Sequence, residues 1–266
     1  MSVRFLFVTL FPEQIEQAAR HSILQRAASK GLIELSCVNP RDFTHDNHRT
    51  VDDTPFGGGA GMVLKPEPFV AAIKKAREML PGAKVIALCP GGRTLNQGLV
   101  KAYAESCADL ILVCGHYEGF DERIFAWVDE KLSIGDYVLT GGELPALILM
   151  DAIARLLPGV LGKMESALDE SFTSGLLEYP QYTRPVVFEG LEVPEVLRGG
   201  NHALIRGWRL KEALKRTYFK RPDLLTLEQK AMLEGKMPEG LTKAERRFYA
   251  ELQAEVEELK KLKGEK

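Results

Sequence analysis

Three segments with the character of buried strands, each leading directly into a loop that carries glycine, constrain the fold of this 266-residue chain most strongly. The segments are residues 84–89, 109–114 and 132–140, and their loops begin at Pro90, Gly115 and Gly141. Such runs are typical of a parallel sheet, whose strand carboxyl ends form a ligand crevice. Glycine in these loops lets the backbone approach a ligand closely. The sequence therefore predicts an α/β fold with a binding site at the three loops.

The hydrophobic pattern predicts further strands and several helices around this core. Strands are expected at residues 3–10 and 32–38, and helices at residues 12–30, 66–79, 96–105, 121–130 and 143–157. The last of these helices is apolar nearly all round, so it is expected to be buried in the core or in a subunit interface. Its charged residues Asp151 and Arg155 are four apart and share one face, where they form an ion pair or present an arginine to a ligand.

A polar segment without clear periodicity divides the chain in two. Residues 163–185 carry the adjacent acids Asp169 and Glu170 and are expected to form a linker or lid. The predicted organisation is an N-terminal parallel-sheet domain at residues 1–162, this linker, and a small all-helical domain at residues 186–266. Residues 198–223 contain eight Lys or Arg against two acidic residues, in a chain whose formal net charge is −2. This local excess of positive charge favours binding to a polyanion such as a nucleic acid.

The sequence excludes several common classes of site. The glycine run at residues 57–61 lacks the Lys and Ser or Thr of a phosphate-binding loop, and no strand is followed by Gly-x-Gly-x-x-Gly. This run lies beside Asp52 and Asp53, where it forms either a backbone platform for a flat ligand or a flexible connector. Four cysteines without Cys-x-x-Cys spacing and five scattered histidines predict reduced thiols and no fixed metal site. No apolar run reaches the ~18 residues that a membrane helix needs, so a cytoplasmic protein with no membrane partner is expected.

Six motifs together resemble those of the bacterial tRNA (guanine-N1)-methyltransferases, which modify the guanosine 3′ to the anticodon at tRNA position 37. They are residues 9–13 (TLFPE), 51–59 (VDDTPFGGG), 115–123 (GHYEGFDER), 133–145 (SIGDYVLTGGELP), 175–185 (GLLEYPQYTRP) and 200–209 (GNHALIRGWR). The resemblance extends from residue 3 to about residue 225. One departure is the run from Cys89 to Gly92, where the family commonly has Ser-Pro-Gln-Gly. This departure concerns the fine shape of the cofactor pocket.

The resemblance implies a methyltransferase of the knotted SPOUT type, with a deep trefoil knot in its N-terminal domain. It also implies a homodimer whose active site is shared between the subunits, and S-adenosylmethionine as the cofactor. The residues expected to bind this cofactor are Leu88, Gly115, Tyr117, Glu118, Gly119, Ile134, Gly135, Asp136, Tyr137, Val138, Leu139, Gly141, Gly142 and Pro145. The knot does not follow from the residues themselves, because general connection rules disfavour one.

Methylation of guanine N1 requires a base, because N1 carries a proton, and a cation for the negative charge that spreads to O6. The resemblance assigns the cation to Arg155 and the base to an acid just before Ser171. An alignment without a gap to the family's aspartate before Ser-Phe places Glu170 at the position of the base. An alignment shifted by one residue places Asp169 there, and the shorter side chain of Asp169 suits the family's site better. The residues expected to contact tRNA are Asp52, Gly57, Gly58, Gly59, His202, Arg209, Lys215 and Arg216. The family's reaction is associated with Mg²⁺, for which no ligand cluster is visible in the sequence.

Two other functions are compatible with the same fold. A related knotted methyltransferase could act on another RNA base, and a non-catalytic relative could bind RNA without methylating it. The lid and the basic segment favour the guanine-specific family over the first alternative. The intact glycine loops and Arg155 argue against the second. The expected activity is methyl transfer from S-adenosylmethionine to N1 of guanosine 37 in tRNA.

Overall fold

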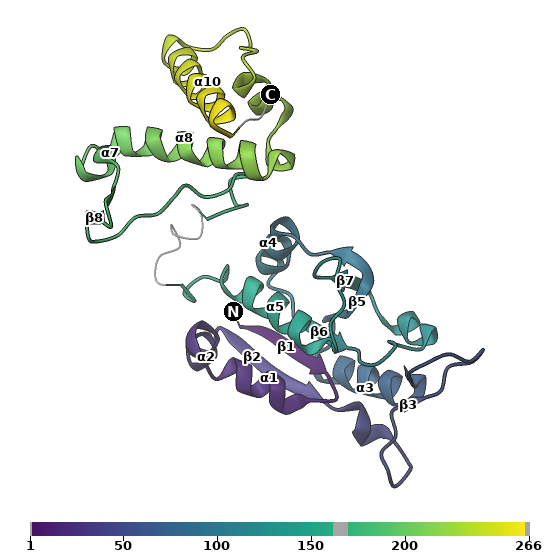
Figure 1. Cartoon of the computed structure of the whole chain (residues 1–266). Helices are drawn as coiled ribbons and strands as arrows, with labels where there is room; N and C mark the ends of the chain where they lie inside the picture. Colours follow the sequence, from purple (N-terminus) through teal and green to yellow (C-terminus); the bar gives the residue numbers. More distant parts are fainter. Residues whose placement is uncertain (1, 162–169, 264–266) are drawn as a thin grey trace. The chain divides into compact units, whose positions relative to one another are not determined.

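The computed structural model describes residues 2–161 and 170–263. The chain forms two compact units, divided between residues 164 and 165 (Figure 1). None of the helices in these described ranges is long and apolar enough to cross a membrane.

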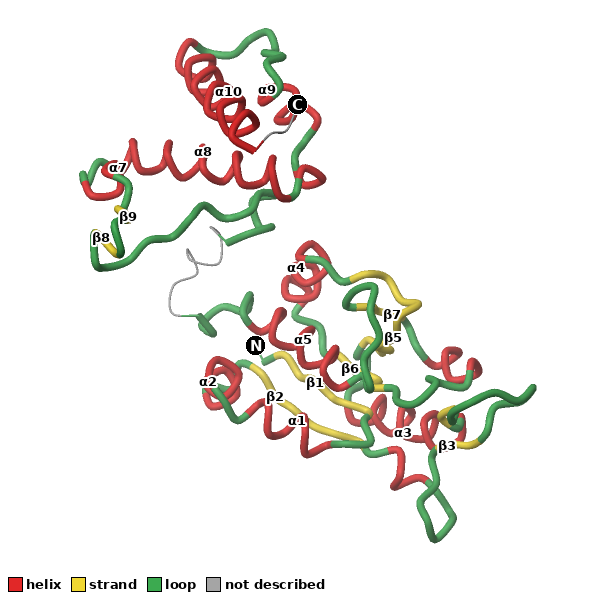
Figure 2. The backbone as a smooth tube through the Cα atoms, viewed as in Figure 1, coloured by secondary structure: helices red, strands yellow, loops and turns green. Residues whose placement is uncertain are grey.

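The first unit is built around a five-stranded sheet with the strand order β2-β1-β6-β5-β7 (Figure 2). The strands are β1 (Val3–Val8), β2 (Ile33–Val38), β5 (Lys84–Thr94), β6 (Leu110–Cys114) and β7 (Glu130–Ser133). Every neighbouring pair is parallel. The central strands β1 and β6 are almost wholly buried, as expected for strands that helices cover on both faces. The predicted α/β fold with a parallel central sheet is confirmed.

Helices cover both faces of the sheet, and the alternation of side chains along β1 shows why. Phe5 and Phe7 belong to one hydrophobic cluster, whereas Leu6 and Val8 belong to a second cluster on the opposite face. The first cluster is covered by α1 (Pro12–Ala19), α2 (Ser22–Ser29), α4 (Gln97–Ser106) and α5 (Glu143–Ala154). The second is covered by α3 (Pro66–Met79) and the 3₁₀ helix η2 (Glu122–Trp127). The sheet is therefore the middle layer of three.

The helix predicted for residues 12–30 is two helices. α1 ends at Ala19, and α2 begins at Ser22, whose φ of +53° is incompatible with a continuous α-helix. Each short helix buries its own apolar residues, Ile15 in α1 and Leu24 with Ala27 in α2. A change of helix direction lets both apolar faces reach the same edge of the sheet. The prediction of one long helix was wrong because the spacing of apolar residues does not reveal such a break.

Strand β5 continues beyond the predicted end at Cys89 and reaches Thr94. Its pairing with β7 shifts register between Leu88 and Arg93, so the residues between them bulge out of the ladder. A Cβ placed on Gly92 would lie 2.4 Å from the backbone nitrogen of Leu132, so this close approach requires glycine. The prediction that the strand ends at Cys89 was therefore wrong, because the proline and glycines that follow form a bulge inside the strand.

The helix predicted for residues 121–130 is the shorter 3₁₀ helix η2, and strand β7 follows it from Glu130. The side chain of Asp121 caps η2 by accepting a hydrogen bond from the backbone of Arg123. The backbone N–H of Asp129 then donates to the carbonyl of Val85 at 2.9 Å. This bond draws the chain into the sheet beside β5 and stops the helix.

The second unit is mainly helical. Its elements are the hairpin strands β8 (Val187–Phe188) and β9 (Leu191–Glu192), the helices α7 (Glu195–Arg198), α8 (His202–Lys220), α9 (Leu227–Leu233) and α10 (Lys243–Lys263), and the 3₁₀ helix η3 (Pro222–Leu224). Its core contains Leu214 of α8, Leu233 of α9, and Leu252 with Val256 of α10. The short antiparallel hairpin is a departure from the all-helical prediction for this region.

Candidate active site

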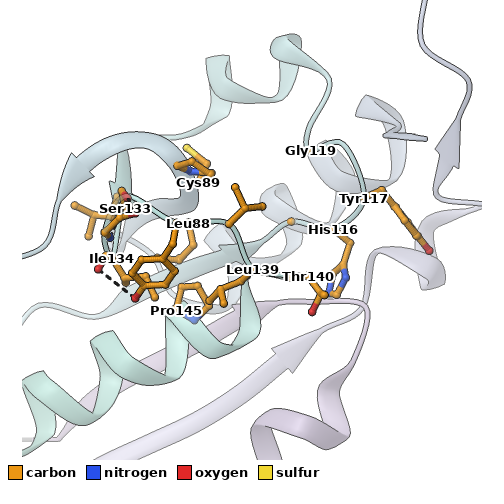
Figure 3. Close-up of a pocket in the computed structure, with 18 of the residues that line it drawn as sticks. Leu88, Cys89, His116, Tyr117, Gly119, Ser133, Ile134, Leu139, Thr140 and Pro145 are labelled. Atoms are coloured by element: carbon orange, nitrogen blue, oxygen red, sulfur yellow. Dashed lines mark hydrogen bonds between the residues drawn. The ribbon is translucent and has the colours of Figure 1, made fainter. Parts of the chain in front are cut away.

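A cavity of about 240 Å³ lies at the carboxyl ends of the central strands (Figure 3). Three stretches form its wall: residues 88–90 of β5, residues 115–119 after β6, and residues 132–135 and 137–142 of β7 and its following loop, with Pro145 of α5. These are the three segments that the sequence predicted to form a ligand crevice. Glycine recurs in the second and third stretches, so part of the wall is backbone.

Gly142 lets two of these stretches cross in close contact. Its backbone N–H donates to the carbonyl of Gly115 at 2.8 Å. A Cβ on Gly142 would lie 2.7 Å from the Cα of Cys114, which is backbone and cannot turn aside. Any larger residue at this position would therefore push the loop after β6 away from the loop before α5.

Ser133 and Gly135 fix the start of the third stretch. The backbone N–H of Gly135 donates to the Ser133 hydroxyl oxygen at 3.2 Å, and that hydroxyl donates to the Gly135 carbonyl at 3.1 Å. Gly135 has a φ of +148°, a conformation that favours glycine. The loop beyond it is exposed, and the side chain of Val138 is 83% accessible. The backbone along this wall is thus held in place while it remains open to a ligand.

All of the residues predicted to bind the cofactor lie on the wall of this cavity except Asp136, which is exposed. The wall also contains residues that were not predicted: Cys89, Pro90, His116, Leu132, Ser133 and Thr140. All six lie in the same three stretches as the predicted residues, so their position in these stretches was the available signal. In Figure 3 the side chain of Tyr117 is directed away from the other labelled side chains.

A buried carboxylate beneath the cavity connects three separate parts of the first unit. Glu143, in the first turn of α5, is 1% exposed. It accepts a hydrogen bond from the hydroxyl of Thr9 at the end of β1, at 2.6 Å. Its other oxygen lies 2.7 Å from Nε2 of His116, in the loop after β6. We call Thr9, His116 and Glu143 the carboxylate clamp, because together they hold both glycine loops against β1.

Replacing Glu143 by alanine should lower the melting temperature by about 2–12 °C and weaken S-adenosylmethionine binding. The change leaves the buried Thr9 hydroxyl without its acceptor, a loss worth roughly 1–3 kcal/mol for each orphaned group. Glu143→Gln keeps an acceptor for Thr9 and should lose less stability. Glu105, an exposed residue of α4, provides the matched Glu105→Ala control. Equal melting temperatures for the two alanine variants would rule out a clamp at Glu143.

None of the predicted catalytic residues is among the described residues that line this cavity. Arg155 caps the carboxyl end of α5, half-buried, and is absent from the cavity wall. It follows Pro145 by ten residues, which places it about 15 Å further along the helix axis. Asp169 lies outside the described residues. Glu170 begins the described part of the second unit, where its carbonyl accepts from the backbone N–H of Thr173 at 3.3 Å.

The glycine run predicted to contact tRNA forms the tip of a hairpin that is joined to the cofactor loop. Strands β3 (Asp52–Asp53) and β4 (Val63–Leu64) pair antiparallel at its base. The backbone N–H of Glu118 donates to the carbonyl of Met62 at 3.0 Å, and that of Leu64 donates to the carbonyl of Gly119 at 2.9 Å. The structure therefore brings Asp52 and the glycine hairpin beside residues that line the cavity.

Several basic residues of α8 are engaged inside the second unit. Lys211 pairs with Glu251 at 2.7 Å, and Lys215 lies 2.5 Å from Glu212 and 2.7 Å from Glu255. Burial acts to lower the pKa of Lys215, but its hydrogen bonds with these two carboxylates outweigh burial, so the pKa is raised. The acidic residues of α10 thus neutralise part of the positive charge in residues 198–223.

The other predicted tRNA contacts on α8 differ in how far they are engaged. The guanidinium of Arg209 lies 4.7 Å from the centre of the Tyr179 ring, and that of Arg216 donates to the carbonyl of Glu178 at 3.1 Å. Both contacts attach α8 to residues 178–179, which precede the β8–β9 hairpin. His202 is exposed at the start of α8, directly after its cap Asn201. Within residues 2–161 and 170–263, no group of three or more His, Cys, Asp or Glu side chains could hold a metal ion such as Mg²⁺.

Comparison with known proteins agrees with the motifs that form this cavity. The model of the family described as tRNA (Guanine-1)-methyltransferase TrmD matches residues 3–227. A tRNA (guanine-N(1)-)-methyltransferase of Methylococcus capsulatus is 55% identical over 225 residues, covering 84% of this chain and 89% of that protein. The protein of the same name from Pseudomonas fluorescens is 53% identical over 240 residues, covering 88% and 96%. That from Synechococcus elongatus is 52% identical over 222 residues, covering 84% and 94%. The chain belongs to the tRNA (Guanine-1)-methyltransferase TrmD family.

Proposed function

We propose that this protein transfers a methyl group from S-adenosylmethionine to N1 of the guanosine 3′ to the anticodon, at position 37 of tRNA. The observation that carries the proposal is that the residues matched by the family model include those that line the cavity. The glycine loops that form the wall lie inside the matched residues, and the curated relatives bear the name of this activity. A tRNA substrate also places the activity in the cytoplasm.

The wall of the cavity fits S-adenosylmethionine. A flat adenine can lie against backbone only where side chains are absent, and the loops after β6 and before α5 carry Gly115, Gly141 and Gly142 there. Peptide groups of residues 134–139 are available to the edge of the adenine, and Leu88 and Leu139 provide apolar contact. When bound, the cofactor supplies an electrophilic methyl group. The protein's contribution is to position that group in line with guanine N1.

The base and the cation of the reaction are proposed from the family motifs. Asp169 or Glu170 removes the N1 proton, and Arg155 stabilises the negative charge on guanine O6. Arg155 lies too far along α5 to reach the cavity of its own subunit, which supports its action in the cavity of a second subunit. Leu144 and Ile148 of α5 are each about half exposed, at 49% and 48%, and would be covered in a homodimer with shared active sites.

We also propose that the first unit is knotted. Strand β7 is at the edge of the sheet, yet the helix that follows it packs against α1, α2, α4 and β6. The chain must therefore cross back past the loops after β5 and β6 to reach α5. The close passage of Gly142 against Cys114 supports such a crossing at this point.

The proposed domains are residues 1–162, a linker at 163–185 and a tRNA-binding domain at 186–266, which the division between residues 164 and 165 supports.

The tRNA backbone should bind the basic residues of α8 that are not engaged with carboxylates. Arg206 and Lys220 are exposed, and neither forms an ion pair with any residue of the described ranges. Arg206→Glu with Lys220→Glu should weaken tRNA binding and lower the slope of log Kd against log salt by about two, because two phosphate contacts are lost. Titration of tRNA at several salt concentrations measures both effects.

Arg26→Glu with Lys75→Glu, a double reversal at exposed positions of α2 and α3, is the control with the same change in charge. Lys215→Glu is a poor test of RNA contact, because it would place a third carboxylate beside Glu212 and Glu255 and destabilise the unit. If the affinity for tRNA changed neither with salt nor with the double reversal, α8 would not be the surface that binds the tRNA backbone.

The decisive test of the proposed function maps the methylated nucleotide. An unmodified tRNA transcript is treated with the protein and S-adenosylmethionine that carries a labelled methyl group, and the label is located by nuclease digestion and mass spectrometry. We expect one methyl group at N1 of guanosine 37. Label on another base would favour a related knotted methyltransferase, and tRNA binding without label would favour a non-catalytic RNA-binding protein.

A further inference from the structure

The hairpin between β3 and β4 carries an aromatic side chain that the fold itself does not use. Phe56 is fully exposed at its tip, with the greatest accessibility among the large hydrophobic side chains of the described residues. The hairpin projects from the first unit to one side of the sheet (Figure 2). An aromatic ring held entirely in water is unfavourable, so its placement at the end of a hairpin indicates a contact with another molecule.

The glycines that follow Phe56 are not required by crowding within the chain. Gly57 and Gly58 have φ values of +85° and +78°, and a Cβ on either would meet no atom within 4 Å. Their role is instead to set the backbone conformation and to leave it uncovered. Within the hairpin tip, the backbone N–H of Gly58 donates to the carbonyl of Pro55 at 3.3 Å, whereas those of Gly57 and Gly59 have no backbone acceptor among the described residues. The tip therefore offers one ring and neighbouring hydrogen-bond donors to a ligand.

The base of the hairpin ties this tip to the cavity. A Cβ on Gly61 would lie 2.2 Å from Oε1 of Glu118, a residue of the cavity wall. Phe56 precedes Gly61 by five residues, so its Cα lies within about 17 Å of the Cα of Gly61 even if the chain is fully extended. Stacked bases of one strand are spaced by ~3.4 Å, so a nucleotide whose guanine enters the cavity keeps its neighbours within reach of Phe56.

We propose that Phe56 stacks on an unpaired base beside the target guanine and replaces the base–base stacking that is lost when that guanine enters the cavity. The proposal rests on the function proposed above. An enzyme that modifies the ring of a base must take it out of its stack, and aromatic side chains compensate for such unstacking. The acids Asp52 and Asp53 at the hairpin base disfavour phosphate contact there, so a base is a better ligand for the tip than the RNA backbone.

Phe56→Ala and Phe56→Leu should raise the Kd for tRNA by roughly 5- to 150-fold, the usual effect of removing one base–aromatic stack. Phe56→Tyr and Phe56→Trp keep a flat ring and should stay near the wild-type value. The Kd for S-adenosylmethionine should not change in any of the four. Leu227→Ala, which removes a similarly exposed apolar side chain from the second unit, is the matched control.

The base that stacks on Phe56 is identified with tRNA that carries an abasic nucleotide on either side of guanosine 37. With one of these substrates, Phe56→Ala should cause no further loss of tRNA affinity, because the partner of the ring is already absent.

The proposal is overturned if Phe56→Leu binds tRNA as well as Phe56→Tyr, or if all four variants match wild type. It is also overturned if the Phe56 variants dissociate a dimer on sedimentation while tRNA affinity per dimer is unchanged, since the ring would then contact a second copy of the chain. Failure of the proposed function is distinguishable, because wild-type protein would then leave N1 of guanosine 37 unmethylated.

Discussion

Asp169→Asn and Glu170→Gln are expected to differ by orders of magnitude in the rate of methyl transfer measured in a single turnover. Each amide keeps the size of its acid and removes its basicity. Guanine N1 must lose its proton to become a nucleophile, and a positioned base typically accelerates such a step by about 10²–10⁴-fold. Only one of two adjacent side chains can point at N1. The substitution of that residue should abolish most of the rate, and the other should have little effect.

Both variants should bind S-adenosylmethionine with wild-type affinity, because neither substitution changes a residue that is predicted to bind the cofactor. Calorimetric titration of the cofactor therefore separates a catalytic defect from a folding defect. A loss in Asp169→Asn alone would support the slipped register of the sequence match, and a loss in Glu170→Gln alone would support the gapless one. If both variants kept near-normal rates, neither acid would be the base, and Asp52 at the hairpin base would be the next candidate.

The sequence was a good guide wherever one short segment contained all the necessary information. Apolar runs such as residues 110–114 are buried strands in any register, and the glycine loops that follow them could be expected at one edge of the sheet. The three segments of the cavity wall could therefore be predicted from their motifs, although six of the lining residues were not named. Asp136 was named but does not line the cavity, and its exposure does not distinguish it from Tyr137 and Val138, which are exposed and do line it.

Features that depend on distant partners could not be predicted in this way. Thr9 and Glu143 are 134 positions apart, so the clamp beneath the cavity appears only when β1 and α5 meet. Lys211 and Lys215 were counted as part of a basic patch, but each pairs with a carboxylate 40 positions away on α10. A local count of charge omits such partners. For the same reason the bulge of β5 was mistaken for a loop, since only β7 shows that the strand continues to Thr94.

A heterodimer with one cavity-defective chain and one Arg155→Ala chain should retain about half of the wild-type activity, whereas each variant alone should be nearly inactive. Gly142→Ala is the cavity-defective variant, because its Cβ would lie 2.7 Å from the Cα of Cys114. Arg155→Ala should lose about 10²–10³-fold in rate, as expected when a group that stabilises an oxyanion is removed. If Arg155 acts across the interface, the Arg155→Ala chain keeps an intact cavity and receives Arg155 from its partner. If Arg155 acts within its own chain, no site in this heterodimer is complete.

The reciprocal heterodimer places both substitutions on one chain and pairs it with a wild-type chain. Action across the interface now predicts almost no activity, because the only intact cavity faces a subunit without Arg155. Action within one chain predicts about half of the wild-type rate. The two heterodimers are purified through different affinity tags on their chains, and their single-turnover rates are compared. The two models therefore predict opposite results for the pair of heterodimers. A wild-type chain that sediments as a monomer while it methylates tRNA would contradict the shared site altogether.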